Sequence, residues 1–485
     1  MLELLGRQHS VCSGISRRGL LQAGGAGLFG LTLQQLMRAE EASPPRRPRA
    51  KSVIFLFLFG GPSQLETFDM KPAAASRVRG PYSPIASRTP DLRICELLPQ
   101  CATISDKFAV VRTLSHTFND HSGGGHYVQT GKRWQIPIGA GFNATSQDWP
   151  AIGSVVEYLS QNSSNDRPPE SKLEGLPSYV VLPNSLGKIQ AYSVRLKRPG
   201  EYGGWLGRGY DPVTTSIEKK DDKDNPYFRS CTDDELTFQI DGLLAPEAMT
   251  LDRLNRRQTL LGQFDQQLRQ VDQEKALSAY DRFQQRALAL VTSERTRTAL
   301  DLRQESAKVR DLYGRDLFGQ STLMARRLVE AGVRYVTVHW DAPDGYSWDS
   351  HQNSKDVGAH LIPGLDQTLS ALLTDLHDRG LLDETLVVCL GEMGRTPTGN
   401  ANWGRDHWRT LFPAVIAGAG VRGGIALGQS DKDAAYAVTP PYKPEDFAAT
   451  IYDALGIDHE LRLPDTQGRP VALIEDGTPI MELFG

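Results

Sequence analysis

The sequence predicts an α/β protein with a mostly parallel, doubly wound sheet flanked by helices. Residues 52–59 form a continuous apolar run of strand length, which is typical of a central strand buried on both faces. Similar runs recur along the chain, and helical patterns lie between several of them. Polar clusters follow these runs, as in open sheets whose sites form beyond the carboxyl ends of parallel strands.

The remaining elements are predicted in chain order from the same patterns. Helices are expected where apolar residues recur with helical spacing. Gly380 marks the C-terminal end of the helix predicted at 364–379. Residues 183–246 are rich in turn-forming residues and residues 247–312 are nearly free of Gly and Pro, so 183–312 is expected to be a loop-rich and helical insertion. The predicted strands are 108–112, 179–182, 335–339, 386–390 and 412–417, and the predicted helices are 319–331 and 364–379.

The first 50 residues are expected to be an export signal and linker. They contain no Asp and only three Glu. Arg17-Arg18 precedes a short, weakly apolar, Gly-rich run at 23–33, which is the twin-arginine export pattern. A basic tail or an uncleaved anchor is the alternative. The prediction is a periplasmic or extracellular protein whose domain spans 51–485.

Composition excludes several classes of protein. The chain has 485 residues and a net charge of −4, so a nucleic-acid partner is not expected. Five Cys are too few for a disulfide scaffold, although export would permit pairing. No apolar run reaches the ~20 residues of a transmembrane helix, so no span is expected in the mature chain.

Ionisable residues gather after the predicted strands. Three His and three consecutive Gly lie in 116–126, three Asp and one His lie in 340–351, and the segments 391–397 and 403–408 add carboxylates, Arg and His. Carboxylates and imidazoles are the ligands of divalent ions. A metal site could hold zinc, calcium, magnesium or manganese. For 116–126, binding of a phosphate-like anion fits equally well, and a flexible surface turn is the remaining alternative. The candidate ligands are His121, Asp349, His351, Glu392, Asp406 and His407.

Other polar residues of these loops are candidates for catalysis and substrate binding. Ser63 follows Gly60-Gly61-Pro62 and could be a nucleophile, an anion ligand or simply a helix N-cap. His121 and His407 could act as general acid or base because His titrates near neutral pH. Arg395 could hold a substrate oxyanion. The substrate-binding candidates are Arg405 and His126.

Several motifs resemble those of sulfatases. The segment 379–388, Arg-Gly-Leu-Leu-Asp-Glu-Thr-Leu-Val-Val, is similar to the sulfatase pattern that leads into a metal-binding strand. Residues 127–131 resemble the end of the sulfatase nucleophile motif, and 446–456 resemble a late sulfatase helix. The opening at 60–72 and the segments 325–334, 392–397 and 404–408 resemble a large bacterial family of exported, sulfatase-like proteins of unassigned function. The resemblance implies an alkaline-phosphatase-like fold.

The chain departs from the sulfatase pattern at three positions. Phe59-Gly60-Gly61 stands where sulfatases have paired Asp, His121 falls at the nucleophilic Cys, and Glu392-Met393 replaces an Asp-His pair. Formylglycine chemistry is therefore not expected. The sequence favours a metal-assisted hydrolase of sulfate or phosphate esters with an altered site, acting on a small or polymeric anionic ester. The alternatives are a non-catalytic binder of sulfated or phosphorylated polymers and a cell-envelope interaction protein.

Overall fold

The computed structural model describes residues 48–135, 142–162, 176–190, 196–217, 219–240, 293–343 and 347–485. These residues fall within one compact unit, Pro48–Gly485. Almost all of the predicted export segment and residues 247–292 of the predicted insertion lie outside the described residues. Both therefore stay predictions.

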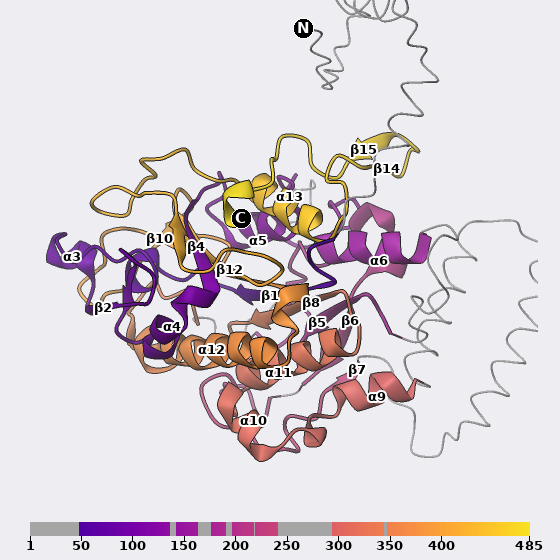
Figure 1. Cartoon of the computed structure of the whole chain (residues 1–485), viewed down its shortest axis with the longest axis horizontal. Coiled ribbons are helices and arrows are strands. Elements are labelled where there is room, and N and C mark those ends of the chain that lie inside the picture. The colour runs from indigo at the N-terminus through magenta and orange to yellow at the C-terminus, as the bar shows by residue number, and fades with distance from the viewer. Residues whose placement is uncertain are drawn as a thin grey trace, which may run out of the picture. The chain divides into compact units, whose positions relative to one another are not determined.

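A nine-stranded sheet forms the centre of this unit (Figure 1). Its strand order is β13-β4-β12-β9-β1-β8-β5-β6-β7. Within the sheet, β12 runs antiparallel to both of its neighbours and β7 runs antiparallel to β6, whereas the other neighbours pair in parallel. The prediction of a mostly parallel sheet is confirmed. The strands are β1 (Ser52–Leu58), β4 (Phe108–Leu114), β5 (Tyr179–Leu182), β6 (Val213–Ser216), β7 (Gln239–Ile240), β8 (Tyr335–Trp340), β9 (Thr385–Leu390), β12 (Phe412–Ala417) and β13 (Ile425–Leu427).

Strand β1 shows why an unbroken apolar run becomes a central strand. All seven of its residues are buried, and successive side chains of a strand point to opposite faces of the sheet. Phe55 and Phe57 pack into the core on one face, while Ile54 and Leu56 pack into the core on the other. Both faces of β1 are therefore covered.

Helices cover both faces of the sheet (Figure 1). The apolar side chains of α4, α9, α11 and α12 belong to one core, and those of α5, α6 and α13 belong to the other. This arrangement confirms the predicted doubly wound α/β class. The helices are α3 (Ser76–Arg79), α4 (Pro99–Thr103), α5 (His121–Thr130), α6 (Ile152–Asn162), α9 (Glu294–Leu300), α10 (Ala307–Tyr313), α11 (Leu317–Glu330), α12 (Ile362–Asp378) and α13 (Pro444–Ala454).

The two helices predicted from their apolar spacing form close to their expected bounds. Helix α11 begins after Asp316, whose side chain accepts a hydrogen bond from the backbone N–H of Gly319, as an N-cap should. Helix α12 begins at Ile362, two residues before its predicted start, and follows a π-helical turn at Val357–Leu361. Both helices pack their apolar faces on the same side of the sheet.

Among the described residues, three two-stranded ribbons lie outside the main sheet, and the sequence predicted none of them. The ribbon of β10 and β11 matters most here, because it carries two of the candidate site residues, Arg395 and His407. The ribbons are β2 (Pro84–Ala86) with β3 (Arg93–Cys95), β10 (Gly394–Arg395) with β11 (His407–Trp408), and β14 (Arg462–Pro464) with β15 (Pro470–Ala472).

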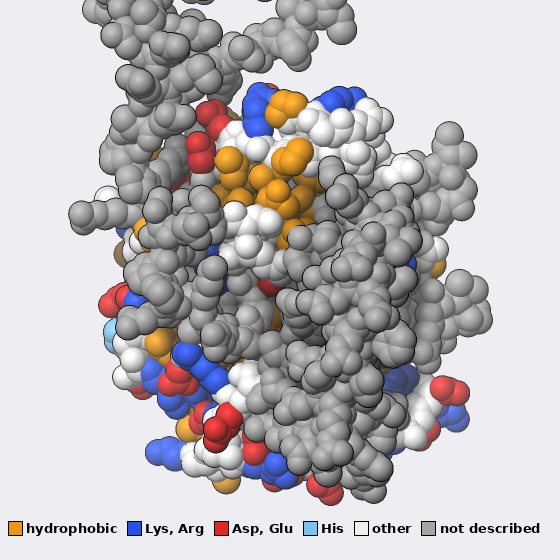
Figure 2. All heavy atoms as spheres, turned by 90° about the vertical axis from the view of Figure 1, so that its right-hand side faces the viewer, with side chains coloured by type: hydrophobic (Ala, Val, Ile, Leu, Met, Phe, Trp, Pro, Cys, Tyr) orange, Lys and Arg blue, Asp and Glu red, His pale blue; other side chains and the backbone are white. Residues whose placement is uncertain are grey.

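Cys95, Cys101, Cys231 and Cys389 are buried free thiols. On the face shown in Figure 2, the largest group of hydrophobic side chains lies near the top, and Lys, Arg, Asp and Glu side chains, with a few hydrophobic ones among them, lie on the other described parts of this face. None of the described helices has the length and apolar character needed to cross a membrane.

Candidate metal centre

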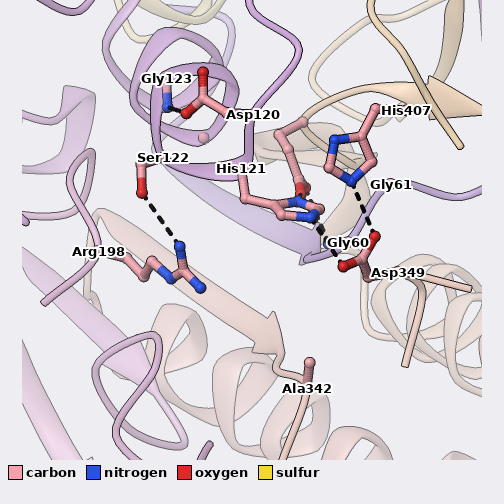
Figure 3. A network of polar contacts seen from close by, with 12 residues as sticks. Gly60, Gly61, Asp120, His121, Ser122, Gly123, Arg198, Ala342, Asp349 and His407 are labelled. Atoms are coloured by element: carbon pink, nitrogen blue, oxygen red, sulfur yellow. Dashed lines mark hydrogen bonds and ion pairs between the residues drawn. The ribbon is translucent and has the colours of Figure 1, made fainter. Parts of the chain in front are cut away.

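Loops at the carboxyl ends of four central strands meet at one place. Gly60 follows β1, His121 begins the helix after β4, Asp349 lies in the loop after β8, and Glu392 follows β9. His407 of β11 joins them (Figure 3). These residues are separated by up to 347 positions, and the sheet topology brings them into contact.

The glycines after β1 allow the loops to approach each other closely. Gly60 has a φ of +111°, and a Cβ there would lie 2.4 Å from the backbone nitrogen of Asp349. The backbone N–H of Gly60 donates to both carboxylate oxygens of Glu392, at 2.9 and 3.2 Å. A side chain at this position would therefore push the two loops apart.

Three imidazoles surround the carboxylate of Asp349. The Nε2 atom of His121 lies 3.1 Å from Oδ2, and the Nε2 atoms of His351 and His407 lie 2.9 and 3.1 Å from Oδ1. The Nε2 atoms of His351 and His407 also lie 3.0 Å apart. Five potential ligand atoms thus face one small volume.

Each imidazole has an oxygen at its other nitrogen. The Nδ1 atom of His121 lies 2.5 Å from Oε1 of Glu392, and that of His351 lies 2.7 Å from Oδ1 of Asp406. The Nδ1 atom of His407 lies 2.9 Å from the carbonyl oxygen of Asn119. Such partners place the proton on Nδ1 and leave the Nε2 lone pair free, which is the form in which imidazole binds metal.

The arrangement concentrates lone pairs and therefore needs positive charge. With their protons on Nδ1, His351 and His407 would direct two lone pairs at each other and at the Asp349 carboxylate. The Nε2 atom of His121 is buried, and its contact with Oδ2 lacks hydrogen-bond geometry. Protons or a metal ion between these atoms would remove the repulsion.

The pKa shifts point the same way. Burial lowers the pKa of His121, but the neighbouring Asp349 and Glu392 carboxylates outweigh burial and raise this pKa to about 9. Burial raises the pKa of Asp349, but His121, His407 and Arg395 outweigh it and hold this pKa well below its usual range. The site favours a cation beside ionised carboxylates.

The donor set fits a divalent transition metal. Ligand atoms of His121, Asp349 and His407 all lie within 4.8 Å of one another. Imidazole nitrogen with carboxylate oxygen suits zinc or manganese better than calcium, which prefers oxygen ligands alone. Glu392 is fully buried and contacts Nδ1 of His121, the ring nitrogen opposite the proposed ligand atom Nε2. Its position is that of a residue that orients a ligand.

The two predicted arginines occupy different environments. Arg395 donates to Oδ1 of Asp349 at 2.7 Å, to the carbonyl oxygens of Gly60 and Gly61, and to that of Arg405. Arg405 forms a buried ion pair with Glu66 at 2.8 Å and donates to three backbone carbonyls. Of these two arginines, Arg395 alone contacts the histidine–aspartate cluster, which consists of Asp349 and the imidazoles of His121, His351 and His407.

Ser63 and His126 lie in buried positions. The hydroxyl of Ser63 makes no hydrogen bond within the described part of the chain and does not cap the short helix that follows it. His126 is fully buried in α5, and its Nδ1 atom lies 3.0 Å from the carbonyl oxygen of Lys132. Their functional roles stay predictions.

Two nearby residues were not among the predicted site residues. His116 lies with its Nε2 atom 2.5 Å from the carbonyl oxygen of Glu392, and burial lowers its pKa to about 4. His116 is therefore a neutral ring that hydrogen-bonds the backbone carbonyl of Glu392. Arg198 donates to the hydroxyl of Ser122, next to His121 (Figure 3). No motif marks Arg198 in the sequence.

The solved structures that this chain resembles share little sequence with it. The lipoteichoic acid synthase LtaP from Listeria monocytogenes matches at 9% identity and a TM-score of 0.37, covering 91% of this chain and 78% of its own. The sulfatase PsFucS1 from Pseudoalteromonas sp. matches at 12% and 0.34, covering 89% and 73%. The alkaline phosphatase from the Antarctic bacterium TAB5 matches at 13% and 0.30, covering 79% and 95%. Similarity at these scores carries no inference for this chain.

Sequence comparison assigns the chain to a family. No curated protein matches it significantly. Residues 50–484 match the family described as "Protein of unknown function (DUF1501)". This match spans the whole compact unit except its ends, and the chain therefore belongs to that family.

Proposed function

We propose that this protein is a metal-dependent hydrolase of sulfate or phosphate esters. The observation that carries the proposal is the convergence of three imidazole Nε2 atoms on the carboxylate of Asp349, with an oxygen at every opposite Nδ1. The similarity of several motifs to sulfatases, and the position of the cluster at the carboxyl ends of parallel strands, support it.

His121, Asp349 and His407 would hold the divalent ion, because their ligand atoms lie within 4.8 Å of one another. Glu392 and the carbonyl of Asn119 fix the orientation of the two rings. A bound divalent ion supplies an activated water and stabilises negative charge that develops in the transition state. Zinc and manganese are the ions that the donor set favours.

His351 is placed to move protons between the site and solvent. Its side chain is 33% exposed, and the carboxylate of Asp406 that faces its Nδ1 atom is 79% exposed. We assign to its Nε2 atom the transfer of a proton to the leaving group or from the attacking water. The Asp406 carboxylate would stabilise the ring while it carries charge.

The proposal extends to substrate and location. The substrate is a small or polymeric anionic ester, and the twin-arginine pattern at Arg17-Arg18 supports export to the periplasm or beyond. A reporter fused to residues 1–50 tests export. Loss of its export on replacement of both arginines by lysine is the expected result.

The decisive experiment combines metal analysis with a panel of aryl sulfate and phosphate esters. We expect about one divalent ion per chain. His407→Ala should lose the ion and the activity, whereas His351→Ala should keep the ion and lose activity. His377→Ala is the control, because His377 is exposed near the end of α12.

Other outcomes separate the alternatives. A chain that binds no divalent ion when saturated with zinc or manganese would refute the proposal. A chain that binds the ion but hydrolyses no ester would favour the non-catalytic binder of sulfated or phosphorylated polymers. Ser63→Ala tests the attacking group, since full activity in this variant would exclude the Ser63 hydroxyl as the nucleophile.

A further inference from the structure

Arg198 is a buried cation beside the proposed metal site. The residue is 9% exposed. Its Nη1 atom donates to Oγ of Ser122 at 3.2 Å, and its Cζ atom lies 5.2 Å from the centre of the Phe59 ring. The same ring lies 5.1 Å from the ring of His121. One aromatic side chain therefore separates the guanidinium from a proposed metal ligand.

The guanidinium is held in place from two sides. The Oγ atom of Ser122 donates to the carbonyl of Phe142 and so presents a lone pair to Arg198. On the other side, Oε1 of Gln190 lies 3.5 Å from Nη2 of Arg198, while the amide nitrogen of Gln190 donates to Asp341 at 2.8 Å. Because its contacts are fixed by neighbouring hydrogen bonds, Arg198 is preorganised.

The first turn of α5 adds positive potential at the same place. Ser122 is the second residue of this ten-residue helix, and Asp120 caps the helix through the backbone N–H of Gly123 at 2.7 Å. The N-terminal end of a helix favours nearby negative charge. Figure 3 shows Arg198 and Ser122 on one side of His121, with Asp349 and His407 on the other.

The arginines predicted from sequence to hold the anion are occupied elsewhere. Arg395 uses Nε, Nη1 and Nη2 to bind three backbone carbonyls and Asp349. Arg405 uses its three nitrogens to bind Glu66 and three backbone carbonyls. A substrate oxyanion at either arginine would compete with these contacts.

We propose that Arg198 binds the tetrahedral oxyanion of the substrate, a phosphate or a sulfate, against the histidine–aspartate cluster. The inference rests on the proposed function and names the residue that selects its substrate class. The planar guanidinium can pair with two oxygens of a tetrahedral anion. The guanidinium lies against Phe59, whose ring also lies beside that of His121, and it donates to Ser122, the residue that follows His121.

Titration of the full-length, metal-loaded protein with inorganic phosphate and, separately, with sulfate tests the inference. Isothermal titration calorimetry would give the two dissociation constants, and the lower constant identifies the preferred anion. Arg198→Met should weaken binding roughly 10- to 100-fold, as expected for loss of charged hydrogen bonds, with metal content unchanged. Arg303→Met is the control, because Arg303 is 77% exposed and pairs with Asp301.

A second variant separates binding from folding. Arg198→Lys keeps the charge but loses the planar fork, so we expect intermediate affinity and an unchanged melting temperature. Wild-type affinity in Arg198→Met would refute the inference, and so would wild-type affinity in Arg198→Lys if Arg198→Met does not fold. A wild-type protein that binds neither anion would also refute it. If anion binding depends on Arg198 but no ester is hydrolysed, the proposed hydrolase function is refuted and the inference about Arg198 stands.

Discussion

Replacing Glu392 with Gln tests whether this carboxylate orients a metal ligand or binds the metal itself. Gln has nearly the same shape and keeps an oxygen that can accept from the backbone N–H of Gly60. It lacks the negative charge that faces Nδ1 of His121 at 2.5 Å. Because Glu392 is fully buried, solvent cannot replace that charge.

The size of the effect follows from the position of Glu392 behind His121. Loss of a carboxylate that orients a metal-binding imidazole weakens metal affinity about 10- to 100-fold, which corresponds to about 1.4–2.7 kcal/mol. Removal of a direct metal ligand would weaken metal affinity more than this and would reduce the number of ligands. The structure predicts the smaller effect, with His121 still able to bind.

Competition with a zinc chelator of known affinity measures the change. Glu392→Gln should bind one zinc ion per chain with about 10- to 100-fold lower affinity than the wild type, and His407→Ala should bind no zinc. Equal zinc affinity in Glu392→Gln and wild type would refute the role of Glu392 in holding His121. Complete loss of zinc from Glu392→Gln would instead make Glu392 a ligand.

Three further predictions concern stability. Arg405→Met should lower the free energy of unfolding by about 3–5 kcal/mol, because it leaves the buried carboxylate of Glu66 without its ion pair; a urea titration showing a loss under about 1 kcal/mol would contradict this. Gly124→Ala should weaken zinc binding and stability together, since its Cβ would lie 3.1 Å from the carbonyl oxygen of Glu392; unchanged values in both assays would count against this contact. Burial lowers the pKa of His126 to about 3, so its contribution to stability is present above the unfolded pKa of about 6.5 and is lost as pH falls toward 3. His126→Gln should reduce this acid dependence by up to about 5 kcal/mol, and parallel stability–pH curves for the two proteins would contradict it.

The sequence predicted the strands that are buried on both faces, because burial demands continuous apolar residues. Strand β5 forms at its predicted bounds and β9 begins one residue earlier than predicted. The strands that it missed are short and half-exposed, as in β6 and β13. Such segments need little hydrophobicity, since neighbouring strands supply their hydrogen bonds, and no periodic pattern marks them.

The candidate site also has a part that the sequence predicted and a part that it could not predict. Sequence identified the loops, because parallel strands with polar ends direct those ends to one edge of the sheet. Sequence placed His121 among the metal ligands and His126 among the substrate-binding residues, but it could not show that the two rings, which lie on one helix, face different surroundings. At about 100° per residue, five residues place their side chains about 140° apart, so His121 faces Asp349 while His126 faces the carbonyl of Lys132.

The arginines depend wholly on tertiary contacts. Arg395 and Arg405 stand in similar polar segments, yet one meets Asp349 and the other meets Glu66, which is 339 positions away in the chain. Arg198 lies in a segment with no motif and reaches the site through Ser122 and Phe59. The sequence by itself determined the α/β class and the loops that carry the chemistry, since both follow from local hydrophobic patterns. Only the tertiary structure decided which side chains meet, because long-range packing sets the partner of each buried charge.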